Sequence, residues 1–347
     1  MKNMSLFLAL AFLCNIHAMD ASYFGSFYLL DTEAKGDFFV EESSFGDDIN
    51  FQNHSLIGAN IYHNINKQVS FHGQVVSLGE VRGDRWNVEI DYAFLAYNMS
   101  KSLQINFGRQ IFPAWMTSPY TSVGYLLPAE KLPYVVSTVS FFNSINGISF
   151  DYKYNDNISI KPFIGQELEN VNLEGATRDL SLRTKYENIY GLEIRYSPFP
   201  EFVFHSTFYQ TDFTASSEQS LLDAIGDLNT NKNRVFSSGF HYEDDYCLTM
   251  LEYGRSDGET TDGVSTRVEV GYFLFGKKLE NWLVHYYMTW SQSAQNDSQK
   301  PLGHQLGFNY TFDDNIKYKM SLEDRQVNTV KNSVHSYRIK MGVDFVF

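Results

Sequence analysis

Apolar and polar residues alternate in segments of about ten residues from Ser22 to the end of the chain. Residues 335–347 show the pattern most clearly, because one row of alternate positions is apolar and the other is mostly polar. The apolar row is Tyr337, Ile339, Met341, Val343, Phe345 and Phe347, and the other row is Ser336, Arg338, Lys340, Gly342 and Asp344. Successive side chains of a β-strand point to opposite faces, so the pattern predicts strands with one apolar and one polar face.

Sixteen segments of this kind can be counted, and the connections between them alternate between long and short. The segments are 22–30, 54–64, 67–78, 86–98, 102–111, 142–154, 157–166, 186–197, 201–212, 234–242, 246–255, 265–276, 282–291, 303–312, 316–325 and 335–347. The short connections are 65–66, 99–101, 155–156, 198–200, 243–245, 277–279 and 313–315. Both chain ends lie on the side of the short connections, which is typical of an outer-membrane barrel with tight periplasmic turns and long external loops.

The sequence after residue 18 has no run near the roughly eighteen apolar residues that a membrane helix needs. A closed barrel is the other structure that satisfies every backbone polar group in hydrocarbon. We therefore predict an all-β fold for residues 19–347: a 16-stranded antiparallel transmembrane β-barrel with lipid outside and water inside. In segment 282–291, Trp282 and Trp290 at the ends of the apolar row match aromatic girdles at the two membrane interfaces.

Residues 1–18 have the layout of a secretory signal peptide. Lys2 precedes an apolar stretch, and Ile16-His17-Ala18 follows it, so cleavage after Ala18 is expected. Cys14 suggests a lipoprotein anchor as an alternative, although the bulky residues before it argue against one. Cys247 is the only other cysteine, which excludes an intramolecular disulfide in the mature chain.

Residues 112–140 have neither strand nor helix periodicity and contain four of the eight prolines. A structureless connection of this length would normally count against the assignment of the neighbouring elements. It is consistent with a barrel if the segment folds back into the bore.

These features resemble those of the Gram-negative general porins. The resemblance is carried by Phe107-Gly108-Arg109-Gln110, by the long connection after it, and by the C-terminal strand that ends on Phe347. It implies that residues 112–140 narrow the bore, that the barrel-assembly machinery reads Phe345 and Phe347, and that the protein forms a homotrimer. The chain departs from the family in that its loop carries only Glu130 and Lys131 as charges. Arg109 also shares the outward row of Phe107 and needs a bulge or a rim position to avoid lipid.

The resemblance implies passive diffusion of small hydrophilic solutes and ions, which depends on the aperture and on the charges around it. The candidate constriction residues are Arg109, Glu130, Lys131, Glu89, Asp91, Lys317, Lys319, Arg338 and Lys340, and further inward charges are predicted at Lys153, Lys161, Arg195, Arg267 and Glu252. The basic residues of the last two strands could face the loop across the bore. Alternatively, Lys319 with Asp344 and Lys340 with Glu323 simply pair across neighbouring strands of the wall.

Other functions are less consistent with the sequence. The formal charge of −14 argues against nucleic-acid binding, and no spacing indicates a metal site, a cofactor or a catalytic group. His205 and Ser206 are adjacent on a strand and must point to opposite faces. The alternative function is an adhesion or receptor barrel with a blocked bore, and a barrel hydrolase is a third possibility. Expected partners are outer-membrane lipid, lipopolysaccharide, the assembly machinery and small solutes.

Overall fold

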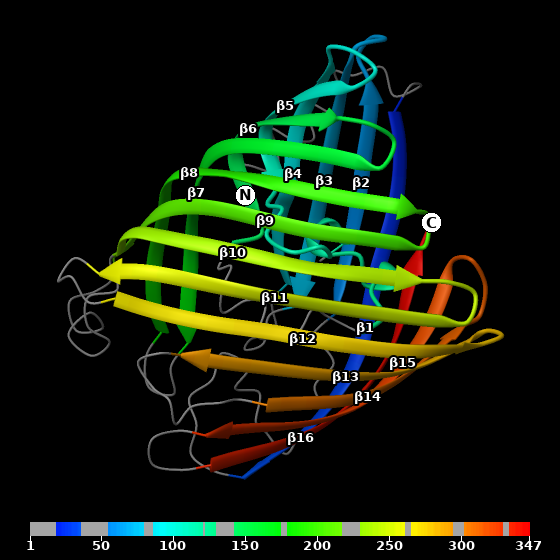
Figure 1. The fold of residues 1–347 in the computed structure, drawn as a ribbon. Coiled ribbons are helices and arrows are strands. Elements are labelled where there is room, and N and C mark those ends of the chain that lie inside the picture. The colour runs from blue at the N-terminus through cyan, green and yellow to red at the C-terminus, as the bar shows by residue number, and fades with distance from the viewer. Residues whose placement is uncertain are drawn as a thin grey trace.

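The structure is a computed structural model that describes residues 19–35, 55–79, 86–120, 122–129, 142–174, 179–216, 230–260, 265–293, 302–328 and 333–347. Within these residues the chain forms sixteen strands and two short 3₁₀ turns (Figure 1). The strands are β1 (Met19–Lys35), β2 (Leu56–Asn64), β3 (Val69–Gly79), β4 (Trp86–Asn98), β5 (Leu103–Ile111), β6 (Ser144–Lys153), β7 (Ile158–Glu174), β8 (Asp179–Phe199), β9 (Phe202–Ser216), β10 (Thr230–Glu243), β11 (Cys247–Thr260), β12 (Ser265–Leu279), β13 (Trp282–Ser293), β14 (Leu302–Thr311), β15 (Ile316–Asn328) and β16 (Ser333–Val346). The predicted signal peptide, residues 1–18, lies outside the described part of the chain.

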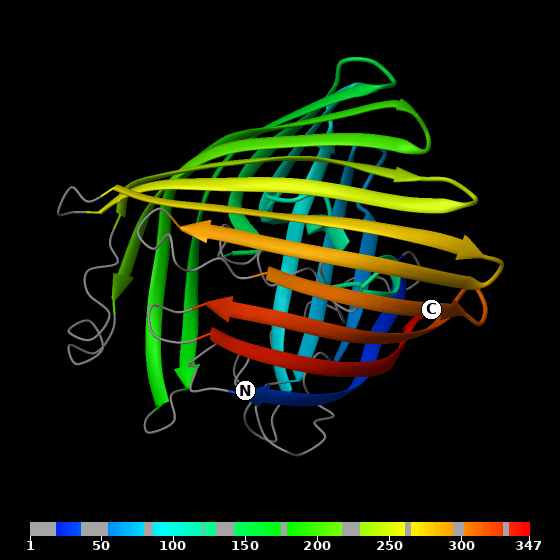
Figure 2. The same cartoon turned by 60° about the horizontal axis from the view of Figure 1, so that its bottom comes forward.

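The strands form one closed antiparallel barrel in which each strand pairs with its sequence neighbours. The first and last strands complete the ring, from Phe24 opposite Val346 to Lys35 opposite His335. Beyond that ladder, the backbones of Tyr23 and Phe347 exchange two hydrogen bonds of 2.7 Å. Figure 2 shows β1 beside β16 at this closure. The sheet therefore has no free edge, and the predicted 16-stranded barrel is confirmed.

The two faces of the wall differ as the alternation predicts. On β16, Ile339 and Met341 are 45% and 47% exposed. Arg338, which belongs to the other row of the same strand, is 4% exposed. Exposed apolar side chains surround the outside of the barrel, among them Leu95, Phe107, Phe150, Ile164, Leu192, Phe208, Phe236, Phe275, Leu306 and Leu322. A continuous apolar belt of this kind is the lipid-facing surface of a membrane barrel.

Aromatic side chains are frequent where the outer face meets the short turns. Exposed examples are Tyr97, Tyr152, Tyr196, Phe199, Tyr246, Trp282, Phe312, Tyr318 and Phe347. Rings at this level are typical of the aromatic girdle at a membrane–water interface. No helix in the described part of the chain is long and apolar enough to cross a membrane.

Four of the short turns share one stabilising device. Asn66, Asn155, Asp244 and Asp313 each accept hydrogen bonds, through one side-chain oxygen, from the backbone N–H groups two and three residues further along the chain. These Asx turns explain why polar residues cluster between the strands. The backbone N–H of Cys247, then that of Tyr246, lowers the pKa of Asp244 to about 2.

The strand boundaries differ from the predictions mainly on the side of the long connections. Strand β7 continues to Glu174 and β8 begins at Asp179, so most of the predicted loop 167–185 is a paired hairpin. Lipid contacts neither face of a hairpin that projects beyond the membrane, so the alternation stops while the backbone pairing continues. On the other side, β8 extends to Phe199 and β12 to Leu279, which is two and three residues, respectively, into their predicted turns. Residues 217–229 of the predicted connection 213–233 lie outside the described residues.

Ile339 is 45% exposed, and a residue with this exposure in a water-soluble protein could be replaced by lysine with little loss of stability. In this barrel the same replacement should be far more destabilising. For Ile339→Lys we expect a loss of about 2–4 kcal/mol in the free energy of folding into lipid vesicles, because the side chain faces hydrocarbon. Asp156→Lys, in the exposed turn after β6, is the matched control and should change this energy by less than about 1 kcal/mol. Equal effects of the two substitutions, measured by reversible denaturation in guanidinium chloride, would contradict the lipid-facing belt.

Candidate pore constriction

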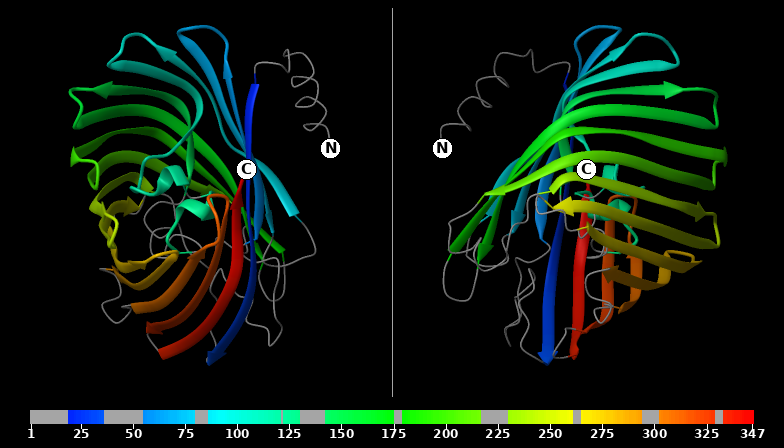
Figure 3. Two further views of the ribbon diagram at one scale, coloured as in Figure 1. Left: turned by 90° about the vertical axis from the view of Figure 1, so that its right-hand side faces the viewer. Right: turned by 60° about the vertical axis from the view of Figure 1, so that its left-hand side comes forward.

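The chain enters the barrel after β5. Residues 112–120 and 122–129 include the 3₁₀ turns η2 (Ser118–Tyr120) and η3 (Gly124–Leu126) and lie against the inner wall (Figure 3). We call these residues the inner loop. Phe112, Trp115 and Leu127 are among its fully buried side chains. The remainder of the predicted loop, including Glu130 and Lys131, lies outside the described residues.

Three adjacent strands hold the start of the inner loop by hydrogen bonds to its backbone. Thr207 Oγ1 on β9 donates to the carbonyl of Pro113, Ser237 Oγ on β10 donates to that of Ala114, and Glu252 Oε1 on β11 accepts from the amide of Met116 over 2.8 Å. These bonds fix the backbone and do not depend on the loop's side chains. Polar side chains on the inner wall therefore satisfy three backbone groups of this segment.

The same part of the loop packs against an apolar inner wall. Its side chains join one buried cluster with Phe142 and residues of β6 to β13. The cluster comprises Phe112, Ala114, Trp115, Met116, Phe142, Ile145, Phe163, Tyr186, Ile189, Tyr209, Val235, Leu248, Met250, Val270, Tyr272, Leu274 and Tyr287. Trp115 lies so close to Gly254 that a Cβ at that position would be 2.4 Å from the indole ring. This side of the interior is dry, and burial of its large side chains stabilises the loop by roughly 1.5–3 kcal/mol each.

Glu252 is fully buried beneath the loop, on the inward face as predicted. Besides the amide of Met116, it accepts a hydrogen bond of 2.8 Å from the hydroxyl of Tyr272. The imidazole of His205 lies 3.4 Å from Glu252 and, through its other nitrogen, 3.4 Å from Glu193. Arg195 pairs with Glu193 and completes a buried polar network behind the loop. His205 therefore interacts with carboxylates of the wall.

Lys319 holds the far end of the inner loop. Its ammonium nitrogen lies 2.6, 2.7 and 3.1 Å from the carbonyl oxygens of Gly124, Leu127 and Ala129. It also forms an ion pair of 2.7 Å with Asp344 on β16, and neither side chain is exposed. The predicted cross-strand pair is therefore present, and the same lysine also binds the loop.

Neighbouring side chains complete this anchor. Lys317 donates to the carbonyl of Tyr125 over 2.7 Å and lies 4.3 Å from the centre of that residue's ring. Asn309 donates to the carbonyl of Pro128 over 2.7 Å. Burial, then the carboxylates of Asp314 and Asp313, raise the pKa of the Tyr125 phenol, which donates to the Asp313 carbonyl at a short turn.

At Gly124 the loop backbone lies close to the wall. A Cβ at this position would lie 2.5 Å from Ser26 Oγ and 2.8 Å from Asp344 Oδ1. The absence of a side chain at position 124 lets the loop backbone lie directly against Ser26 and Asp344. Tyr28 fixes Asp344 from the other side through a hydrogen bond of 2.7 Å.

The predicted acidic residues of β4 have different surroundings. Asp91 accepts a hydrogen bond of 2.7 Å from Ser122 and so ties the middle of the loop to a third part of the wall. Glu89 lies two residues away and is exposed. Because β4 is far from β11 in the strand order, the inner loop crosses the interior between separate parts of the wall.

The other basic residues of the last strand pair within the wall. Lys340 lies 3.2 Å and Arg338 3.9 Å from Glu323 on β15, so the predicted Lys340–Glu323 pair is also present. Both basic side chains are nearly inaccessible. Their charges are neutralised close to the wall.

Arg109 avoids lipid by pairing with a neighbour. Its guanidinium forms an ion pair with Glu167 on β7 and donates to the carbonyl of Ile90 over 2.9 Å. Gly108 before it has φ +129°, and a Cβ there would be 2.6 Å from the carbonyl oxygen of Ala93.

Arg267 was predicted to face inward, and the structure shows that this is wrong. It lies on the same row of β12 as the exposed Phe275 and pairs with Asp257 at 2.7 Å. The other row, with Val270 and Tyr272, is buried against the inner loop. The more apolar row of β12 faces inward because the loop covers it.

The C-terminal residues lie at the barrel closure. Phe347 is exposed, and Phe345 stacks on Phe27 with ring centres 5.9 Å apart.

The sequence did not predict the loop contacts of Thr207, Ser237 and Asn309, because small polar residues on an inward row carry no distinguishing signal. In the described part of the chain, no group of three or more His, Cys, Asp or Glu residues is arranged to hold a metal ion.

No protein-family model matches this chain, and no curated protein matches its sequence. Its fold is similar to that of an anion-selective porin from Comamonas acidovorans, with a TM-score of 0.67, 10% identity, and coverage of 95% of this chain and 100% of that chain. The outer membrane channel DcaP of Acinetobacter baumannii gives a TM-score of 0.65, 11% identity and coverage of 95% and 98%. A trimer form of OmpT, an outer membrane protein of Vibrio cholerae, gives a TM-score of 0.60, 10% identity, and coverage of 95% of this chain and 100% of that chain. The chain thus shares the closed 16-stranded β-barrel fold of these outer-membrane proteins.

Removal of the Lys319 ammonium should release the far end of the inner loop. Lys319→Met leaves Asp344 buried without its cation, so we expect a loss of about 3–5 kcal/mol in stability. The amides of residues 122–129 should exchange with deuterium at least about tenfold faster, because the local opening energy falls. Lys161→Met, which removes an inner-wall ion pair of 3.4 Å with Asp151, is the control. Mass spectrometry showing the same exchange in both variants would exclude Lys319 as the anchor.

Proposed function

We propose that this protein is a porin: a barrel through which small hydrophilic solutes and ions diffuse passively across an outer membrane. The observation that carries this proposal is the inner loop, which is attached to β4, to β9–β11 and to β14–β16 and crosses the interior of the barrel. A 16-stranded barrel is wide enough for an aqueous channel, and a fixed loop inside it would set the aperture.

The proposal includes the route to the membrane and the assembly. Residues 1–18 serve as the signal peptide, and residues 19–347 form the barrel. The assembly machinery recognises Phe345 and Phe347 at the barrel closure, and lipid and lipopolysaccharide surround the belt. Three copies form the functional unit, as supported by the likeness to a barrel solved in a trimer form. The protein performs no bond chemistry.

The close packing of the loop against β6–β13 also favours a second candidate. In that case the bore is blocked, and the barrel is a receptor or adhesion protein whose external loops bind a partner. The two candidates differ in conductance across a planar bilayer, since a porin produces ohmic current steps and a blocked barrel inserts without current.

Shortening the loop tests its role in the aperture. A deletion of 120–132 removes η3 and the carbonyls that Lys319 binds, and we expect it to raise single-channel conductance about twofold or more, because the narrowest section dominates the resistance of a pore. A deletion of 217–229, of equal length in an external connection, is the control and should leave the conductance near that of the intact protein. An unchanged conductance after deletion of 120–132 would show that this loop does not set the aperture.

A further inference from the structure

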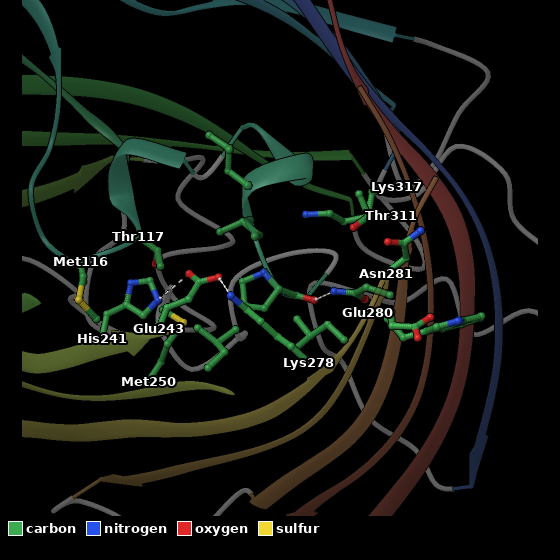
Figure 4. Close-up of a pocket in the computed structure, with 17 residues that line it drawn as sticks. Met116, Thr117, His241, Glu243, Met250, Lys278, Glu280, Asn281, Thr311 and Lys317 are labelled. Carbon is green, nitrogen blue, oxygen red and sulfur yellow. Dashed lines mark hydrogen bonds and ion pairs between the residues drawn. The ribbon is translucent and has the colours of Figure 1, made fainter. Parts of the chain in front are cut away.

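A cavity of about 300 Å³ lies between the inner loop and the wall of β10–β15, on the side of the short turns (Figure 4). Thr117 and Leu127 of the loop form one side, and Glu280 and Asn281 of the turn after β12 lie at the other. This volume is at the lower end of the range for ligand pockets, so it suits a small molecule better than an oligosaccharide.

One part of the cavity is apolar. Met116 and Leu127 of the loop face Leu248 and Met250 of β11, and all four side chains are buried. A hydrocarbon group of a ligand would lose its water here at little cost to the protein. Thr117 adds a buried hydroxyl group to the lining.

The charged side chains of the cavity differ in whether they have a partner of opposite charge in direct contact. Glu243 lies 2.8 Å from the ammonium of Lys278 and 3.2 Å from the imidazole of His241, so its charge is shared by two partners. Lys317 extends from β15 toward the loop (Figure 4). Its direct contacts among the described residues are the carbonyl and the ring of Tyr125, which are neutral.

Two carboxylates near Lys317 are already engaged. Asp344 is paired with Lys319 and bonded to Tyr28, and Glu243 is held by Lys278 and His241. A half-buried ammonium whose direct contacts are neutral, next to an apolar wall, attracts an anion more strongly than an ammonium in water does. Glu280 at the mouth limits the total charge and so disfavours a ligand with several negative charges.

We propose that this cavity binds a small organic monocarboxylate, with its carboxylate at Lys317 and its hydrocarbon part against Met116, Leu127 and Met250. The site would be a station for such solutes on the path through the barrel, a role that rests on the proposed pore function. The binding itself requires only the folded barrel.

Benzoate, benzamide and acetate separate the two parts of this site. Benzamide has the ring without the charge, and acetate has the charge without the ring. Isothermal titration of the refolded barrel in a nonionic detergent should show saturable binding of benzoate, and binding at least about tenfold weaker for each of the other two. Equal affinities for benzoate and benzamide, or for benzoate and acetate, would overturn the proposal.

Lys317→Met should weaken benzoate binding about tenfold or more, because the carboxylate loses its charged donor. Lys153→Met, an exposed lysine at the turn end of β6 outside the cavity, should bind benzoate as the unaltered protein does. Met250→Gln leaves the contact between Lys317 and Tyr125 in place, so it tests the apolar part even if Lys317→Met disturbs the loop. It should weaken benzoate binding without changing the response to acetate.

The outcomes also separate this site from the pore. A barrel that binds benzoate but carries no current would refute the porin proposal and retain the site. A conducting barrel with no saturable benzoate binding, or with benzoate binding that Lys317→Met and Met250→Gln leave unchanged, would refute the site and retain the porin.

Discussion

Every backbone N–H and C=O group in the hydrocarbon of a membrane needs a partner within the protein, and closure of the sheet between β1 and β16 satisfies this requirement. The backbone bonds between Tyr23 and Phe347 extend the seam to the last residue. Once the ring is closed, the period-two pattern assigns each side chain to lipid or to the interior. The apolar belt and the polar inner wall both follow from this one constraint.

The interior has the same requirement, because a loop folded into a barrel has its own backbone groups to satisfy. Lys319 donates hydrogen bonds to three carbonyls at one end of the loop, and Glu252 accepts a hydrogen bond from a backbone amide at the other end. The charges on the inner wall are therefore partly structural. A lysine that would seem in sequence to line the pore is instead buried beneath the loop. Lys317 lines the cavity described above together with Leu127, Pro128 and Asn309 of the same anchor.

The strands and their order follow from the sequence because lipid imposes a strict alternation on the wall. The pair Lys319–Asp344 follows from strand register for the same reason. The contacts of the inner loop do not, because they are made through backbone carbonyls, which every residue offers. Arg267 was misplaced because the loop turns the inner face of β12 into an apolar surface, and the alternation alone cannot distinguish such a surface from one that faces lipid. The β7–β8 hairpin was missed because its end lies beyond the membrane, where no alternation is required.

The position of the inner loop across the bore is the central claim, and a disulfide between residues 26 and 124 tests it most directly. With Cys247 replaced by serine, the pair Ser26→Cys and Gly124→Cys should form a disulfide in the folded barrel in lipid, because a Cβ at position 124 would lie 2.5 Å from the side-chain oxygen of Ser26. Mass spectrometry of the digested protein should then find peptides of β1 and of the loop joined. Two free thiols in a fully folded barrel under oxidising conditions would contradict this placement of the loop.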